Sequence, residues 1–237
     1  MSQELTVLAV TAASIGLLHT LLGPDHYLPF IVMARAREWS ATKTMWITLL
    51  CGIGHIGSSV LLGMIGIALG IAVTKLELFE SVRGNLAAWL LIGFGLVYFI
   101  WGLRRALRNR PHEHRHTHAD GVTHAHLHVH AKEHLHAHEK EGAPSLTPWV
   151  LFTIFVLGPC EPLIPLLMYP AAKSSPMGVV LVTSIFGGVT IATMLGIVMV
   201  SRLGINLLPT ARLERYVHAL AGATVCLCGV AIQFLGL

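Results

Sequence analysis

Long apolar stretches separated by short polar connections dominate the chain. About 20 consecutive apolar residues suffice for a helix to cross roughly 30 Å of hydrocarbon. Six stretches reach or approach that length, and they cover residues 5–22, 45–73, 86–103, 149–170, 178–200 and 216–236. The pattern therefore predicts an all-α membrane protein with six transmembrane helices, the second of which is long enough to tilt.

The sequence Leu-Gly-Pro occurs twice, at the end of the first predicted span and within the fourth. Pro24 and Pro159 lack a backbone N–H and clash with the preceding turn, so each should break its helix. Unwound backbone at membrane depth is tolerated only where it is buried in protein or lines a wet cavity. We therefore expect helices 1 and 4 to be broken, with the two breaks facing each other around a central site.

The two halves of the chain resemble each other around these prolines. Aligning "LGPDHYLP" with "LGPCEPLIP" places Asp25 opposite Cys160 and His26 opposite Glu161. Each half holds three spans, so the second copy must insert upside down, as in many secondary transporters. We expect a 3+3 inverted repeat. Its parts are a first three-helix repeat at 1–103, a His-rich loop at 104–147 and a second three-helix repeat at 148–237.

Composition supports a membrane location and gives no reason to expect a nucleic-acid partner. The chain is 54% hydrophobic and 12% charged, with a mean hydropathy of +0.69, whereas about a quarter of an average soluble domain is charged. Lys and Arg are retained on the cytoplasmic side. If the N-terminus is outside, thirteen of the 16 Lys and Arg residues fall in connections on the cytoplasmic side. We therefore expect a bacterial-type cytoplasmic (inner) membrane protein with both termini outside and a cytoplasmic His-rich loop.

Ionisable residues within the apolar spans are the first candidates for a functional site, because such residues are costly in a membrane. Of the 12 acidic residues, only Asp25 and Glu161 fall within apolar segments, one in each break. A regular helix would hold His19 and His26 about 10 Å apart, but a break can fold them together. Mixed imidazole and carboxylate ligands suit transition metals. We expect a metal site formed by His19, Asp25, His26, His55, Glu161 and, as a softer ligand, Cys160.

A His-rich tract between the third and fourth spans contains eleven of the 15 histidines. Such low-complexity tracts bind transition metals through neutral imidazoles and cannot build a packed core. We expect the tract to be disordered without metal, although alternating histidines on one face of a strand are also conceivable. The expected auxiliary ligands are His112, His114, His116, His118, His124, His126, His128, His130, His134, His136 and His138.

Several of these motifs resemble one known group. "HTLLGPDH", "GIGH", "GPCEPLIPLLMYPA" and the His-rich connection are similar to the nickel/cobalt transporter (NicO) superfamily, specifically its UreH-like branch of urease-accessory membrane proteins. The resemblance implies that His19, Asp25 and His26 are metal ligands, although one extra residue separates His19 from Asp25 compared with the family signature. It also implies nickel or cobalt as the transported ion, with zinc left open.

These observations predict a permease, with no enzymatic activity and no prosthetic group. The expected function is transport of a divalent transition-metal ion, most favourably Ni²⁺ or Co²⁺, by alternating access at the intramembrane site. The expected partners are the metal ion, the lipid bilayer and, as a candidate, a cytoplasmic metallochaperone. The direction of transport, the driving ion, the oligomeric state and an anionic substrate stay open.

Two alternatives from other functional classes remain. "GPCEP" also resembles the proline-flanked cysteine of membrane thiol-disulfide carriers of the CcdA-like type, which are inverted repeats as well. Such carriers need one cysteine in each half, whereas Asp25 stands opposite Cys160. All four cysteines lie in apolar segments, so no disulfide framework is expected. The other alternative is a membrane-anchored metal sensor or storage protein in which the His tract is the functional part.

Overall fold

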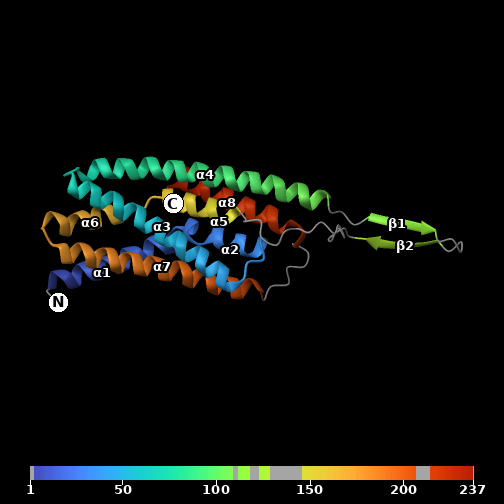
Figure 1. The fold of residues 1–237 in the computed structure, drawn as a ribbon, viewed down its shortest axis with the longest axis horizontal. Coiled ribbons are helices and arrows are strands. Elements are labelled where there is room, and N and C mark those ends of the chain that lie inside the picture. The colour runs from blue at the N-terminus through green and yellow to red at the C-terminus, as the bar shows by residue number, and fades with distance from the viewer. Residues whose placement is uncertain (1–2, 109–111, 118–122, 129–145, 207–213, 237) are drawn as a thin grey trace.

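The fold is a bundle of helices along one long axis, with a small hairpin beyond one end (Figure 1). The computed structural model describes residues 3–108, 112–117, 123–128, 146–206 and 214–236. The helices are α1 (Gln3–Leu22), η1 (Pro24–His26), α2 (Leu28–Ala36), α3 (Ala41–Ala68), α4 (Val73–Arg108), α5 (Leu146–Leu157), α6 (Leu163–Ala172), α7 (Pro176–Asn206), η2 (Glu214–Tyr216) and α8 (Val217–Leu235). The strands are β1 (His112–Thr117) and β2 (Thr123–His128).

Five of the described helices are long and apolar enough to cross a membrane, namely α1, α3, α4, α7 and α8. Many large apolar side chains lie on their outer faces, for example Val7 (60% exposed), Leu61 (62%) and Val97 (68%). Lipid is the solvent that tolerates such a surface. The prediction of an integral, all-α membrane protein is confirmed. The fourth predicted span is different, because it consists of two short apolar helices, α5 and α6.

The first helix breaks where the sequence predicts. α1 ends at Leu22, and the chain turns through Gly23 into η1 before α2 begins. The turn satisfies its own backbone, because the Gly23 N–H bonds to the His19 carbonyl and the His26 N–H bonds to the Gly23 carbonyl. Pro29 occupies the first turn of α2, where a missing N–H costs nothing.

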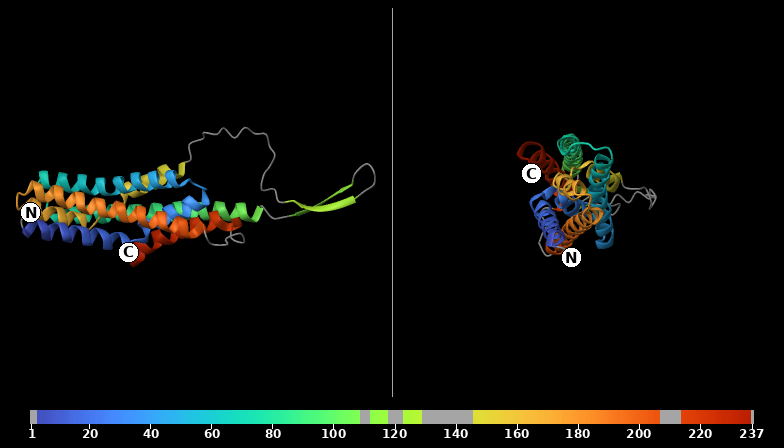
Figure 2. Two further views of the ribbon diagram at one scale, coloured as in Figure 1. Left: turned by 90° about the horizontal axis from the view of Figure 1, so that it is seen from below. Right: turned by 90° about the vertical axis from the view of Figure 1, so that its left-hand side faces the viewer.

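The second break also falls where the sequence predicts. α5 ends at Leu157, α6 begins at Leu163, and the chain between them contains Pro159. α1 and α6 lie in the half of the bundle near the N-terminus, while α2 and α5 lie nearer the hairpin (Figures 1 and 2). The two breaks therefore lie at a similar depth in the bundle.

Two helix boundaries differ from the prediction in a way that matters for the site. α3 ends at Ala68, and α4 begins at Val73, well before the predicted start at residue 86. The predicted spans leave the charged stretch around Glu80 in a connection, whereas in the structure it forms the first turns of α4. Glu80 is completely buried, so the prediction that only the two breaks carry intramembrane acidic residues is wrong.

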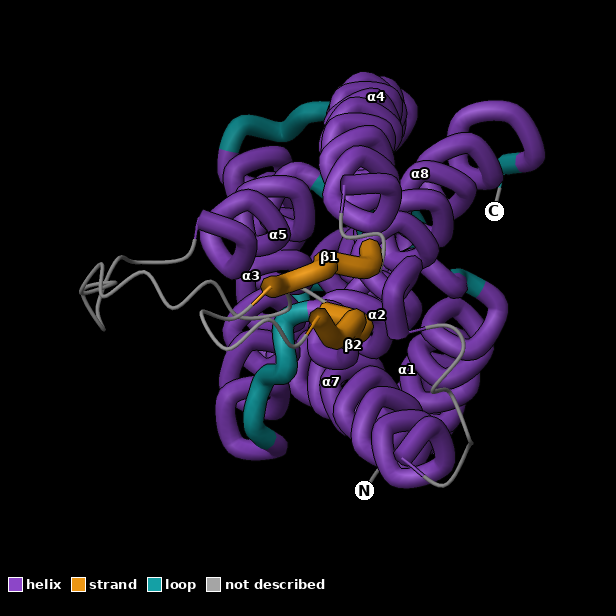
Figure 3. The backbone as a smooth tube through the Cα atoms, turned by 90° about the vertical axis from the view of Figure 1, so that its right-hand side faces the viewer, coloured by secondary structure: helices purple, strands orange, loops and turns teal. Residues whose placement is uncertain are grey.

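α4 and α8 pack backbone to backbone along much of their length. A side chain at Gly222 would overlap the backbone of Phe99, and one at Gly95 would overlap the backbone of Cys226. Small residues permit this approach between membrane helices. Figure 3 views the bundle from the hairpin end and shows α2 among α3, α7 and α8.

The described parts of the His-rich tract form an antiparallel hairpin. In its register His112 pairs with His128, His114 with His126 and His116 with His124. The remaining predicted auxiliary ligands, His118, His130, His134, His136 and His138, lie outside the described residues.

Candidate functional site

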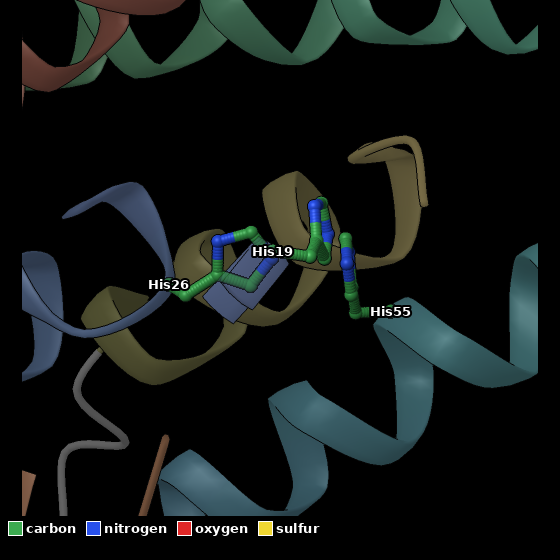
Figure 4. A group of neighbouring side chains, drawn as sticks. All are labelled: His19, His26 and His55. Carbon is green, nitrogen blue, oxygen red and sulfur yellow. The ribbon is translucent and has the colours of Figure 1, made fainter. Parts of the chain in front are cut away.

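Three histidines from three different elements meet in the middle of the bundle (Figure 4). His19 lies in the last turn of α1, His26 ends η1 and His55 lies in the middle of α3. Each offers a ring nitrogen, and these three nitrogens lie within 4.8 Å of one another. The ring centroids of His19 and His26 are 4.6 Å apart and those of His26 and His55 are 5.0 Å apart.

The break after α1 produces this convergence. Two regular helical turns would separate His19 and His26 by about 10 Å, whereas the turn at Gly23 brings their rings into contact. The Nδ1 atom of His26 lies 3.1 Å from the Gly23 carbonyl oxygen and 3.2 Å from Oδ1 of Asp25. Asp25 therefore orients His26 and is not itself one of the three converging groups.

Two imidazole nitrogens of this cluster have no hydrogen-bond partner within the described part of the chain. They are Nε2 of His26 and Nε2 of His55, and both side chains are about 3% exposed. Buried polar atoms are normally paired, because leaving one unpaired costs roughly 1–3 kcal/mol. The cluster can therefore accept a ligand that supplies a proton or a positive charge.

The other predicted site residues take different positions. Cys160 is fully buried, and its Sγ lies 3.8 Å from Nε2 of His19. Glu161 is exposed and lines a cavity, so it does not join the histidines. Adjacent residues in a turn point in different directions, which is why Cys160 faces inward while Glu161 faces the cavity. Cys51, Cys226 and Cys228 are free in the structure, as is Cys160.

A cavity of about 550 Å³ lies against the histidine cluster. Its lining includes all three histidines together with Asp25, Asn85 and Gln233. Asn85 accepts a hydrogen bond from Gln233 at 3.0 Å, which ties α4 to the last turns of α8 beside the cavity. The site is thus accessible to a small polar molecule, while Cys160 is not among the residues that line it.

Sequence reasoning missed two residues of the site, Glu80 and Arg83. Oε2 of Glu80 accepts a hydrogen bond from the backbone N–H of Cys160 at 3.1 Å. Arg83 contacts Oε1 of Glu80 and donates to the carbonyl oxygens of Val156 and Gly158. The i, i+3 spacing of an acidic and a basic residue was the available signal.

Together, the fold and the site define an integral membrane protein in which two interrupted helices enclose a buried centre of histidine, cysteine and carboxylate side chains. The chain belongs to the family described as cytochrome c biogenesis protein transmembrane region, which matches residues 28–231. No curated protein and no solved structure matches the chain.

This membership corrects the assignment to the nickel/cobalt transporter superfamily and its UreH-like branch, which is wrong. The predicted function of nickel or cobalt transport is overturned by the same finding, and ion transport, nickel, cobalt and metal binding gain no support from the family. The "HTLLGPDH" motif lies before residue 28, outside the matched region. Its glycine and proline are what any interrupted membrane helix requires, so they did not identify a substrate.

Proposed function

We propose that this protein is a membrane thiol-disulfide carrier whose reactive group is the Cys160 thiol. The family supports the proposal, since its members are described as cytochrome c biogenesis proteins. The observation that carries it is the contact of Cys160 Sγ with His19 Nε2 at 3.8 Å. A thiol becomes a nucleophile only after it loses its proton, and an adjacent histidine is one arrangement that removes that proton.

The proposed substrate is a low-molecular-weight disulfide, RSSR, because a cavity of about 550 Å³ admits a small molecule and excludes a protein domain. His19 takes the thiol proton, and the Cys160 thiolate attacks one sulfur of RSSR. A mixed disulfide forms, the RS–SR bond breaks, and the leaving thiolate recovers the proton as RSH. A thiol R′SH on the other side then attacks the mixed disulfide at its R sulfur, which yields RSSR′ and restores the Cys160 thiol.

In this proposal Cys160 acts without a second cysteine of the chain. Asp25 occupies the position that aligns with Cys160 in the first half. Cys51 is buried in a different apolar cluster from Cys160, with Leu151 and Phe155. A carrier with one thiol must hold its cargo as a mixed disulfide, and this requirement again favours a small substrate.

We also propose that the two halves form an inverted repeat that exposes Cys160 to each side in turn. The helix contacts support this, because exchanging α1–α4 for α5–α8 maps three of the observed pairs onto three others. The α1–α7 contact corresponds to α5–α3, α2–α8 corresponds to α6–α4, and α2–α7 corresponds to α6–α3; all six pairs occur. The count of Lys and Arg supports a cytoplasmic position for the hairpin.

The test of the carrier uses proteoliposomes loaded with reduced glutathione, with cystine added outside. Wild type should release free thiol on the outside at a rate well above that of protein-free liposomes. Cys160→Ser should reduce that rate to the protein-free value, because serine cannot form a mixed disulfide. Cys226→Ser, in α8, is the matched control and should keep the wild-type rate. Equal rates for wild type and Cys160→Ser would overturn the proposal.

A second candidate function is the binding of a transition-metal ion by the histidine cluster, as in a membrane metal sensor or storage protein. It is favoured by the three ring nitrogens within 4.8 Å of one another and by the unpaired Nε2 atoms of His26 and His55. Neutral imidazoles are ligands for Zn²⁺, Ni²⁺, Co²⁺ and Cu²⁺. The His-rich tract between α4 and α5 adds eleven further histidines as candidate ligands.

The metal stoichiometry of the purified full chain distinguishes the two sets of histidines. After equilibrium dialysis against Zn²⁺, His55→Ala should lower the bound zinc by one ion per chain, and deletion of residues 112–138 should remove the remainder. His218→Ala is the matched control, because His218 is hydrogen-bonded to the Tyr98 hydroxyl away from the cluster. If His55→Ala leaves the stoichiometry unchanged, the cluster does not hold a metal.

A further inference from the structure

Side chains from α3 and α4 hold the second helix break, whereas the first break is held by its own turn. Near Pro24, the backbone bonds of Gly23 and His26 stay within the turn. Near Pro159, the groups that a helix end leaves unsatisfied are bound by residues far away in sequence. This difference between the breaks points to a separate role for the residues that hold the second one.

Arg83 satisfies the end of α5. Its Nη2 donates to the Val156 carbonyl at 2.9 Å and to the Gly158 carbonyl at 3.3 Å, and it also donates to the Ser58 hydroxyl at 2.7 Å. A guanidinium presents five donors in a rigid fork and stays charged, which suits it to bind several acceptors at once. Arg83 therefore fixes the backbone on the α5 side of Cys160.

Glu80 fixes the backbone of Cys160 itself. Its carboxylate accepts the Cys160 N–H at 3.1 Å and the Ser59 hydroxyl at 3.3 Å. Ser59 Oγ lies 3.2 Å from the same N–H and accepts from it as well. The Glu80 side chain is 1% exposed, and Arg83 is its ion-pair partner. Both ends of the broken segment thus depend on one ion pair, whose carboxylate is buried and whose guanidinium is partly exposed.

We propose that Glu80 and Arg83 form a latch that keeps Cys160 buried against His19 and that must release before the thiol can meet a substrate in the cavity. The flanking residues Pro159 and Glu161 already line that cavity, while Cys160 is fully buried. In this proposal, the break moves so that the sulfur reaches the cavity that its two neighbours already line. Pro159 also packs against α4, since a side chain at Gly84 would meet its ring at 2.9 Å. Glu80 and Arg83 are positioning residues for Cys160.

This inference rests on the proposed role of Cys160, but its test measures the accessibility of the thiol and not carrier activity. Two single-cysteine proteins are prepared, one that retains Cys160 and one that retains Cys51. Each receives Arg83→Gln, Glu80→Gln or Arg83→Lys, and Glu4→Gln, which breaks the surface pair with Lys173, is the matched control. The rate of labelling by a small maleimide is measured in proteoliposomes.

Arg83→Gln and Glu80→Gln should speed the labelling of Cys160 by about 10- to 100-fold, the factor expected for losing a charge-assisted hydrogen bond. Arg83→Lys keeps the charge and should restore part of the protection. Cys51 should label at an unchanged slow rate in every variant, and Glu4→Gln should change neither cysteine.

Two results would overturn the latch. One is an unchanged rate for Cys160 in Arg83→Gln and Glu80→Gln. The other is a parallel rise for Cys51, which would mean that the bundle loosens as a whole. Either result leaves the exchange assay of Cys160→Ser intact, so the latch and the carrier function fail separately.

Discussion

Replacement of Arg83 by methionine is the strongest test of the electrostatics of the bundle. The substitution keeps most of the side-chain volume but leaves the Glu80 carboxylate buried without its ion-pair partner. Removal of one member of a buried pair typically costs about 3–5 kcal/mol. The Arg83 side chain is 20% exposed. We therefore expect the free energy of unfolding to fall by about 3 kcal/mol, the lower end of that range.

The double variant Glu80→Gln/Arg83→Met separates the stranded charge from the lost hydrogen bonds. It removes both charges, so its cost is that of the unpaired Val156 and Gly158 carbonyls, about 1–3 kcal/mol. The double variant should therefore be no less stable than Arg83→Met alone, and it should be more stable if the stranded charge dominates. The stability of both variants is measured by unfolding with sodium dodecyl sulfate in mixed micelles, with circular dichroism as the signal. If the double variant loses more free energy of unfolding than Arg83→Met alone, the Glu80 carboxylate does not depend on this arginine.

The remaining predictions concern packing and the surface. Gly222→Leu should destabilise the protein by at least about 3 kcal/mol, because the new side chain would overlap the Phe99 backbone and separate α4 from α8; thermal unfolding in detergent checks this, and an unchanged midpoint would contradict it. Glu4→Gln should shift stability by less than about 1 kcal/mol, because Glu4 and Lys173 are each 52% exposed; a larger loss by the same measurement would show that this pair anchors α1. Tyr98→Phe should cost about 1 kcal/mol through the hydrogen bond to His218, and denaturation that matches wild type would exclude that contribution.

The helix breaks were predictable because proline acts locally. Pro24 and Pro159 remove a backbone donor wherever they stand in a helix, and α1 and α5 end directly before the Gly-Pro pairs. The approach of His19 and His26 followed from the first break. Their approach to His55 depended on the packing of α3, which no local pattern specifies.

The residues that hold the second break could not be recognised from hydropathy averaged over a window of sequence. A window across Lys75, Glu77, Glu80 and Arg83 contains too many charges to resemble a membrane segment. Whether such charges lie in water or in protein depends on partners more than 70 positions away, such as Val156 and Gly158. The family was misjudged for a related reason, because residue types that bind metal also serve as hydrogen-bonding groups in a membrane interior.

The separation in sequence between Arg83 and its carbonyl partners has a consequence for biogenesis. When α4 leaves the ribosome, residues 156–160 have not yet been synthesised, so the translocon receives Glu80 and Arg83 with an incomplete set of partners. The pairing of Glu80 with Arg83 within one helix turn lets the two charges enter the lipid together. The hydrogen-bond partners of Arg83 are then complete only when the second half of the chain docks on α4.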